Sequence, residues 1–293
     1  MEKRRKLFKN FSKRSKTEKI VFAIVFVLFL LYAIALIYPV FFAFTASLLE
    51  NGRAYVKNPM ALPEKPYFSN YPKAFTQLKV RETSFFGMFI NSVWWAFGST
   101  ALTILSSAMM AYVVAKYKFR GRELLYATAL LVMMMPIYGT TAAKYRLLTK
   151  LGATDSPLFL ICAPWAFGTN FLLIYSFFKA LPWSYSEAAF IDGAGHFYVF
   201  FKIMLPMAFP SVTAVFVVGF MGSWNDWSTP LLYFPNMPTL ATGLWQYERQ
   251  MQYQANQPVY FAGALTAMIP LFAVFLVMQN TIMTKVYMGG LKG

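Results

Sequence analysis

The sequence predicts an all-α integral membrane protein with six membrane-spanning helices and both ends of the chain in the cytoplasm. Of its 293 residues, 58% are hydrophobic and only 13% are charged, too few to cover a soluble globule of this size with polar surface. Six long runs carry no charged residue except Asp226 at the end of the fifth. A helix of about 20 apolar residues crosses the roughly 30 Å hydrocarbon core of a bilayer. Lys and Arg gather in the connections between alternate runs, as expected for cytoplasmic loops.

The six runs are apolar on every side, which favours helices over strands. A membrane β-barrel would instead show short segments of alternating apolar and polar residues. The first run is far longer than the apolar part of a signal peptide, so we interpret it as a membrane helix that is not cleaved. Together the runs form one transmembrane domain over residues 20–284, with helices expected near residues 20–47, 85–115, 124–143, 156–178, 203–227 and 257–284.

The distribution of basic residues orients these helices. If the N-terminus lies inside, the cytoplasmic segments are 1–19, 116–123, 179–202 and 285–293, and they hold 17 of the 27 Lys and Arg residues. The outer connections are longer in total but hold only 10, so both termini are predicted to be cytoplasmic. The basic N-terminal segment would lie on anionic lipid or bind a protein partner, and the last nine residues form a cytoplasmic tail.

The outer connections also carry a net positive charge. Subtracting five acidic residues from their 10 basic ones leaves +5, which could attract an anionic solute or an acidic protein, or simply be a solvated loop surface. The whole chain has a net charge of +16, which would suggest nucleic acid in a soluble protein. Here the charges cluster between apolar runs, so a lipid bilayer is the expected partner and nucleic acid is not. The five acidic residues are Glu50, Glu64, Glu82, Asp155 and Glu248.

Residue types that enzymes need are scarce in this sequence. Cys162 is the only cysteine and His196 the only histidine, so neither a metal cluster nor a nucleophilic triad is expected. No Gly-x-x-x-x-Gly-Lys-Ser/Thr loop occurs that could hold the phosphates of ATP. We therefore expect a protein that is not an enzyme and that binds no cofactor or metal itself.

One motif lies in the predicted cytoplasmic loop between the fourth and fifth runs. Residues 187–193 read Glu-Ala-Ala-Phe-Ile-Asp-Gly, and after nine further residues 203–206 read Ile-Met-Leu-Pro. We expect Ser186 to cap a short helix that begins near Glu187, because serine accepts hydrogen bonds from the first turn of a helix. Gly193 is expected to end or bend that helix, since glycine tolerates conformations that other residues avoid.

This spacing resembles the EAA signature of permease subunits in binding-protein-dependent ATP-binding-cassette (ABC) importers: Glu-Ala-Ala, three residues, Gly, nine residues, Ile-x-Leu-Pro. The resemblance implies a type I importer permease fold with a cytoplasmic coupling segment, residues 184–202, that docks into a cleft of the ATP-binding subunit. If the resemblance is set aside, the same stretch is interpreted as an ordinary amphipathic connector. By this resemblance, coupling to the ATPase is assigned to Glu187, Ala188, Ala189, Asp192 and Gly193.

The C-terminal end adds a second resemblance, to the second permease of the maltose-type subfamily. It depends on Gln279 and on the closing residues 289–293, with Leu291 standing where valine is more common. This resemblance implies a carbohydrate substrate and a complex in the bacterial cytoplasmic membrane. The implied partners are a second, different permease, two ATPase subunits that bind ATP and Mg, and an extracytoplasmic solute-binding protein.

Aromatic residues gather in the outer connection that precedes the last run. Such rings stack on sugars and also anchor proteins at the membrane interface, and the maltose-type resemblance implies that this loop reaches toward the binding protein. At the outer end of the fifth run stands one acidic residue, which is either functional or a helix cap. The candidate contacts with substrate or binding protein are Trp224, Asp226, Trp245, Tyr247 and Tyr253. The positive charge of the outer connections favours an acidic oligosaccharide over a neutral one as substrate.

Two other classes of protein fit the sequence less well. An ion-coupled secondary transporter or channel would show buried charge pairs or inverted repeats near the middle of the membrane, and neither is evident. A membrane-bound glycan enzyme would need paired acidic residues or a metal cluster on one side, which are also absent from the sequence. Copurification of an ATPase subunit would support the importer alone.

Overall fold

The computed structural model confirms the all-α class. It describes residues 15–135, 139–162, 166–250 and 256–285, and apart from one isolated bridge between Val80 and Thr83 their regular structure is helical. The chain divides into two compact units, which are described separately. Unit 1 holds residues 1–71 and 256–265, and unit 2 holds residues 72–255 and 266–293.

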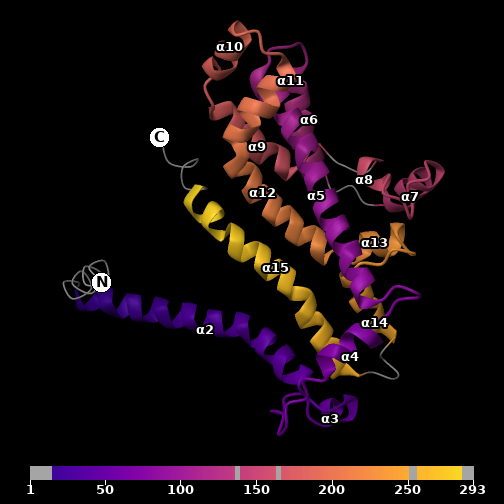
Figure 1. Cartoon of the computed structure of the whole chain (residues 1–293). Helices are drawn as coiled ribbons and strands as arrows, with labels where there is room; N and C mark the ends of the chain where they lie inside the picture. Colours follow the sequence, from indigo (N-terminus) through magenta and orange to yellow (C-terminus); the bar gives the residue numbers. More distant parts are fainter. Residues whose placement is uncertain (1–14, 136–138, 163–165, 251–255, 286–293) are drawn as a thin grey trace. The chain divides into compact units, whose positions relative to one another are not determined.

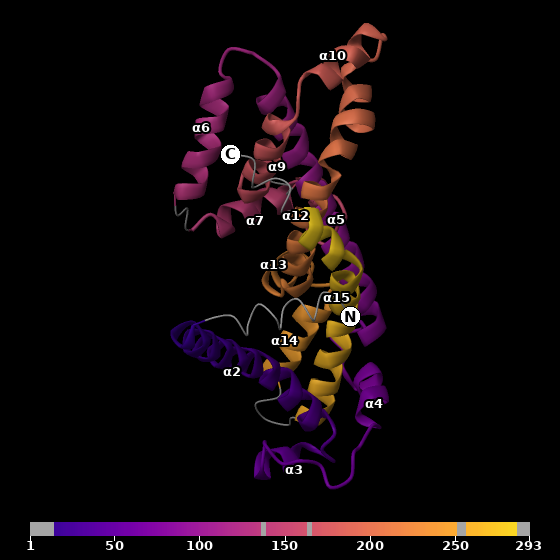
Figure 2. The same cartoon turned by 90° about the vertical axis from the view of Figure 1, so that its left-hand side faces the viewer.

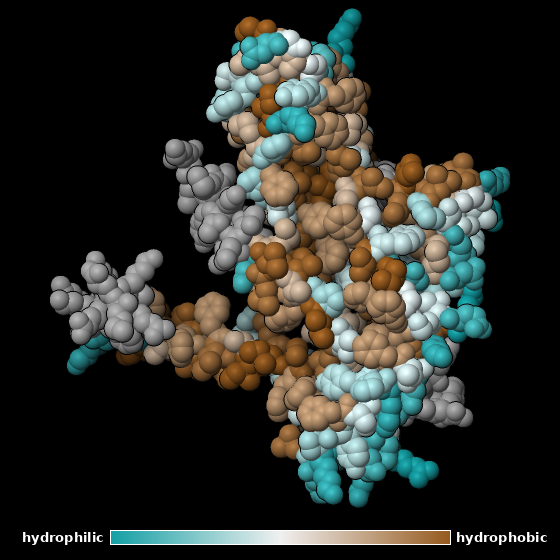
Figure 3. All heavy atoms as spheres, in the orientation of Figure 1, coloured by the Kyte–Doolittle hydropathy of each residue, from teal (hydrophilic) through white to brown (hydrophobic). Residues whose placement is uncertain are grey.

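Helix α2 (Lys16–Ser47) dominates unit 1 and is apolar all round. A capping box begins it, in which the Ser15 hydroxyl accepts from the Glu18 N–H and the Glu18 carboxylate accepts from the Ser15 N–H. Its most apolar stretch has no buried residue, and Figure 3 shows it covered with hydrophobic side chains. Such a surface needs lipid or another subunit to cover it.

The end of α2 is closed by Asn70, the first residue of α4 (Asn70–Gln77). The last carbonyls of a helix lack partners within it. The fully buried Asn70 amide donates to the carbonyl oxygens of Ser47 at 2.9 Å and Leu49 at 2.7 Å. Asn70 therefore ties the connection after α3 (Gly52–Lys57) back to the end of α2.

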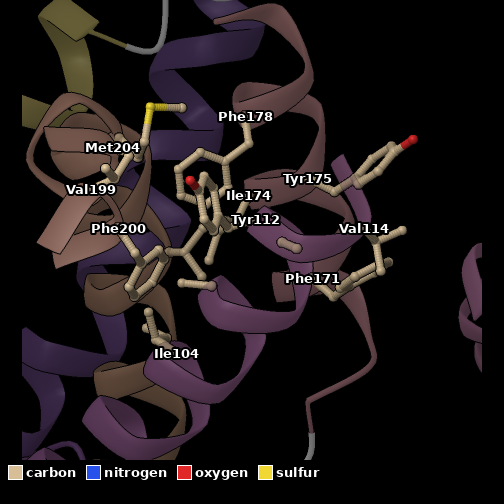
Figure 4. Close-up of a cluster of buried hydrophobic side chains, with 14 of the residues drawn as sticks. Ile104, Tyr112, Val114, Phe171, Ile174, Tyr175, Phe178, Val199, Phe200 and Met204 are labelled. Carbon is tan, nitrogen blue, oxygen red and sulfur yellow. The ribbon is translucent and has the colours of Figure 1, made fainter. Parts of the chain in front are cut away.

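Unit 2 is built around α5 (Phe85–Lys116), which packs against α9 (Thr169–Ala180) and α12 (Leu205–Asn225), as Figures 1 and 2 show. The three helices share a core of side chains that are nearly all buried. Figure 4 shows Tyr112 of α5 between Phe178 of α9 and Phe200, with ring centroids 5.5 Å and 5.2 Å from those of its neighbours. This core lies toward the C-terminal end of α5.

A widened turn leads into α12. Helix α11 (His196–Tyr198) continues through the π-helix η1 (Val199–Met204), where the Leu205 N–H bonds to the Phe200 carbonyl five residues earlier. Pro206 has no N–H, and its ring would clash with the carbonyl four residues before it, which disfavours a regular α-helical ladder here. Residues 196–225 still form one continuous apolar helix of 30 residues.

The third and fourth expected spans are shorter and interrupted. Within the run expected at 124–143, α6 ends at Met134 and α7 begins at Thr141; within 156–178, α8 and α9 are separate helices. Gly139 and Gly168 have φ values of 81° and 138°, which are incompatible with a continuing α-helix. Unit 2 also contains α6 (Arg122–Met134), α7 (Thr141–Lys150), α8 (Phe159–Cys162), α10 (Ser184–Ile191), α13 (Ser228–Tyr233) and α14 (Leu240–Gln250), and α15 (Gln257–Lys285) runs through both units.

Four helices in the described part of the chain are long and apolar enough to cross a membrane. They cover Lys16–Ser47, Phe85–Lys116, His196–Asn225 and Gln257–Gln279. The count of six spans with both termini inside is therefore not confirmed and stays a prediction. The basic segment 1–14 and the tail 286–293 lie outside the described residues.

Candidate functional site

The EAA motif folds as the short helix α10 and ends as the sequence predicts. Gly193 has a φ of 82°, in the left-handed region that glycine tolerates best. The Ala194 N–H donates to the Ala189 carbonyl at 2.9 Å, and the Gly193 N–H donates to the Phe190 carbonyl at 3.0 Å. This pair of bonds is a Schellman motif, which satisfies the last carbonyls and fixes the direction in which the chain leaves.

The N-terminal end of α10 differs from the prediction. The helix begins at Ser184, and Ser186 is a fully buried residue of its first turn. The expectation that Ser186 caps a helix beginning near Glu187 is therefore wrong. Glu187 also lies in the first turn and is exposed, where its carboxylate favours the positive end of the helix dipole.

Four of the five residues assigned to coupling are on the surface. Ala189 is 8% exposed and packs into the core, whereas Glu187, Ala188, Asp192 and Gly193 are exposed. Ile191 stands on the same short helix with 86% of its side chain exposed. An uncovered aliphatic side chain among exposed acidic and small residues is the surface expected of a protein contact.

The C-terminal end of α5 contacts the coupling segment and the residues just before it. The Lys116 ammonium donates to the Leu181 carbonyl at the end of α9. The hydroxyl of Tyr117 lies 2.9 Å from Nδ1 of His196, and Trp183 packs edge-on against the Tyr117 ring. These contacts connect the segment to the C-terminal end of α5, which lies next to α11 in Figure 1.

Tyr117 stays protonated in this contact. Burial raises the pKa of Tyr117, and the neighbouring Tyr112 adds to the shift through a hydrogen bond and its charge. A neutral phenol can donate its proton to the His196 ring. The sequence analysis missed this contact, because the two residues are 79 positions apart along the chain.

Two of the outer candidates have structural roles. Trp224 is 4% exposed, and its indole N–H donates to the Ala267 carbonyl at 3.1 Å. Asp226 accepts from the N–H and hydroxyl of Ser228 and from the Thr229 N–H, each at 3.0 Å. Asp226 therefore caps the start of α13, the alternative that the sequence left open.

The other three outer candidates are Trp245, Tyr247 and Tyr253, and they differ in their surroundings. The Trp245 and Trp227 rings are stacked, 4.5 Å apart and within 8° of parallel, with the Arg249 guanidinium 5.2 Å from the Trp245 centroid. Trp227 is 41% exposed, so an open face of aromatic and basic character remains. Tyr247 is partly buried, and burial raises its pKa. Tyr253 lies outside the described residues.

A polar pocket of about 270 Å³ lies among α5, α12 and the helices that follow α6. Hydroxyl groups of Ser99, Thr100 and Thr103 line it from α5, together with the side chains of Asn170 and Lys144. The sequence analysis missed this pocket. The available signal was the recurrence of hydroxyl residues at positions 99, 100 and 103, on one face of an otherwise apolar helix.

The family comparison identifies the class of protein. Residues 103–286 match the family described as "Binding-protein-dependent transport system inner membrane component". The match covers more than half of the chain, so the chain belongs to this family. It is a multi-pass membrane protein and a permease subunit, whose family role is transport and not catalysis.

Individual relatives extend the match over most of the chain. The chain is 31% identical over 271 residues to the diacetylchitobiose uptake system permease protein NgcG of Streptomyces coelicolor, covering 91% of this chain and 88% of the relative. It is 28% identical over 251 residues to the arabinooligosaccharides transport system permease protein AraQ of Halalkalibacterium halodurans, covering 85% and 86%.

A solved structure shares the fold. It is described as a crystal structure of a bacterial ABC transporter involved in the import of the acidic polysaccharide alginate. One of its chains matches with a TM-score of 0.74 and 22% identity, covering 91% of this chain and 98% of that chain. The type I importer permease fold therefore applies to this protein.

Proposed function

We propose that the chain is one of two permease subunits of an ATP-driven saccharide importer, and that residues 184–202 transmit movement from an ATPase subunit to the membrane helices. The observation that carries this proposal is that residues flanking α10 contact the C-terminal end of α5. The surface of α10 is exposed and offers a contact, while Lys116 bonds to Leu181 before it and Tyr117 bonds to His196 after it. A saccharide is favoured because the relatives described above are permeases for diacetylchitobiose and arabinooligosaccharides.

In the proposed assembly, six helices span the bacterial cytoplasmic membrane with both termini inside. A different permease forms the other half of the path, two ATPase subunits bind ATP and Mg, and a binding protein delivers the sugar outside. The uncovered apolar surface of α2 supports a lipid or subunit contact over its length. The exposed Trp227–Trp245 stack supports a contact with the binding protein or its sugar.

Glu187→Lys tests the coupling role. We expect the complex of permeases and ATPases to assemble, but sugar-stimulated ATP hydrolysis to fall at least about tenfold. Charge reversal at a rim position of an interface alters the electrostatic match between partners by on the order of 1–2 kcal/mol. The measurement is ATP hydrolysis by the purified complex in nanodiscs, with and without loaded binding protein.

Glu123→Lys is the matched control for Glu187→Lys. It makes the same charge change on an exposed residue in the other predicted cytoplasmic loop, so its hydrolysis should stay near that of the unmodified complex. Unchanged stimulation in Glu187→Lys would contradict the coupling assignment. Full-rate uptake without any ATPase subunit would instead support the ion-coupled alternative.

The charge of the sugar is a second point that can be tested. We propose that the substrate is an acidic oligosaccharide. The outer connections have a net charge of +5, and the Arg249 guanidinium lies over the Trp245 ring of the outer aromatic stack. The cognate binding protein is expected to gain thermal stability with uronic-acid saccharides more than with neutral ones, since ligands stabilise the folded state that binds them. A response to neutral saccharides alone would exclude the acidic substrate.

A further inference from the structure

The polar pocket lies at a depth where polar groups are costly. Its α5 residues lie around the middle of that helix, which falls between Thr100 and Ala101, while Gly219 and Ser223 belong to the last two turns of α12. A membrane-spanning α5 therefore places the pocket between the middle of the bilayer and the predicted outer side. Polar side chains at that depth must find partners within the protein or face a wet cavity.

Part of the pocket wall has an ordinary structural explanation. The hydroxyls of Ser99 and Thr100 on α5 lie 3.2 Å and 3.3 Å from the hydroxyl of Ser223 on α12. Hydrogen bonds of this kind join neighbouring helices in lipid, where they are worth about 1 kcal/mol. These three residues would therefore be present even if nothing bound in the pocket.

Trp95 is not explained in the same way. It lines the pocket, is only 6% exposed, and its indole N–H has no hydrogen-bond partner among the described residues. The ring is fixed by Phe159 and Phe234, whose centroids lie 5.7 Å and 5.4 Å away. A buried N–H without a partner is costly, but this nitrogen has almost no accessible surface. Trp95 therefore contributes a fixed apolar wall to the pocket and no donor group.

Lys144 gives the pocket lining a positive charge. It is the one charged side chain among the residues that line the pocket, all of which are described. Its ammonium lies 5.9 Å from the ring centroids of both Phe159 and Tyr233. Charge over aromatic rings is attractive, and it leaves the ammonium protons available to hydroxyl or carboxylate oxygens.

We propose that this chain binds one sugar unit of the transported saccharide in this pocket, with the side chains of Lys144, Thr103 and Asn170 as its hydrogen-bonding partners. The proposal rests on the proposed function and adds a site for its substrate. A volume of about 270 Å³ is near the lower end for small-molecule sites, which suits a single sugar ring better than a whole oligosaccharide. Gly219 lines the pocket where α12 approaches α5 closely, since a Cβ there would lie 3.1 Å from Thr100 Cγ2.

The first test is uptake by the complete transporter in proteoliposomes, containing both permeases, the ATPases and the binding protein. The probe is whichever saccharide, uronic-acid or neutral, most stabilises the binding protein. Gly219→Leu should fill the pocket and lower uptake at least about tenfold. The control Gly222→Leu should leave uptake near normal, because a Cβ at Gly222 meets no atom within 4 Å.

Smaller changes guard against a folding defect in Gly219→Leu. Lys144→Met removes the lining ammonium, and Thr103→Val replaces a lining hydroxyl by a methyl group of similar size. Each is expected to raise the KM for uptake of that saccharide roughly three- to tenfold, the effect of one lost hydrogen bond. Normal KM values in both variants would overturn the proposal.

A labelling experiment tests the pocket without relying on transport. In a Cys162→Ser background, Thr103→Cys should react with a small cationic methanethiosulfonate, and the saccharide should slow the reaction. Phe97→Cys is the control: Phe97 is on the same helix and 59% exposed, so the sugar should not protect it. Equal protection at both positions, or none at Thr103→Cys, would contradict the site.

The two proposals fail in different ways. If no saccharide stabilises the binding protein or stimulates ATP hydrolysis by the unmodified complex, the saccharide importer function is wrong and the pocket proposal falls with it. If a saccharide does both, but pocket variants keep normal uptake and labelling is not slowed, only the pocket proposal is wrong.

Discussion

Phe178→Ala is expected to lower the free energy of unfolding by about 3 kcal/mol. The Phe178 side chain is fully buried, with its ring centroid 5.5 Å from that of Tyr112 and 6.5 Å from that of Phe200. Large-to-small changes in a packed core cost about 3–5 kcal/mol for phenylalanine. The lower end applies here because packing, and not transfer from water, drives helix association in lipid.

Chemical unfolding of the nanodisc complex, followed by tryptophan fluorescence, would measure this loss. Leu173→Ala on the same helix is the matched control, because Leu173 is 53% exposed and its truncation leaves no enclosed cavity. The control should change stability by less than about 1 kcal/mol. Equal losses in the two variants would mean that α9 does not pack as described.

Gly193→Val is expected to reduce sugar-stimulated ATP hydrolysis by about tenfold. The left-handed conformation at Gly193 costs other residues about 1–2 kcal/mol, and β-branched residues adopt it least readily. Valine would therefore favour a different end for α10 and move the surface that carries Glu187 and Asp192. Hydrolysis by the purified complex, with and without loaded binding protein, measures the effect.

Two variants isolate the cause of the Gly193→Val effect. A Cβ at either Gly193 or Gly195 meets no atom within 4 Å, but Gly195 has an ordinary φ of −77°. Gly195→Val should therefore keep most of the stimulation, and Gly193→Asn should recover part of it because asparagine tolerates the left-handed region. A defect in Gly195→Val as large as in Gly193→Val would point to steric exclusion from the partner, and against backbone strain.

The long helices were largely predictable from the sequence. The run expected at residues 85–115 ends one residue before α5 does, because a uniformly apolar segment flanked by charged residues defines its own limits. The end of α10 was predictable for a different reason. Gly193 follows a short helical pattern, and the backbone preference of glycine is a local property that the sequence displays directly.

Features that depend on distant residues were not predictable. Ser186 is a plausible cap by local preference, yet α10 begins soon after Pro182, and the core covers the Ser186 side chain. Trp224 looked available for an outer contact, but its indole bonds to Ala267, 43 residues further along the chain. The pocket needs α5 beside α12, an arrangement that no single segment encodes.

The widened turn η1 sets the rotational phase of everything that precedes it in the same helix. An α-helix advances about 100° per residue, so the extra residue taken up by an i→i−5 bond turns the preceding side chains by roughly that angle. Val199 and Phe200 are both buried in this phase. Deleting one residue from η1 would remove this extra rotation. Val199 and Phe200 would then face another side of α12, and α10, which precedes them, would be displaced as well.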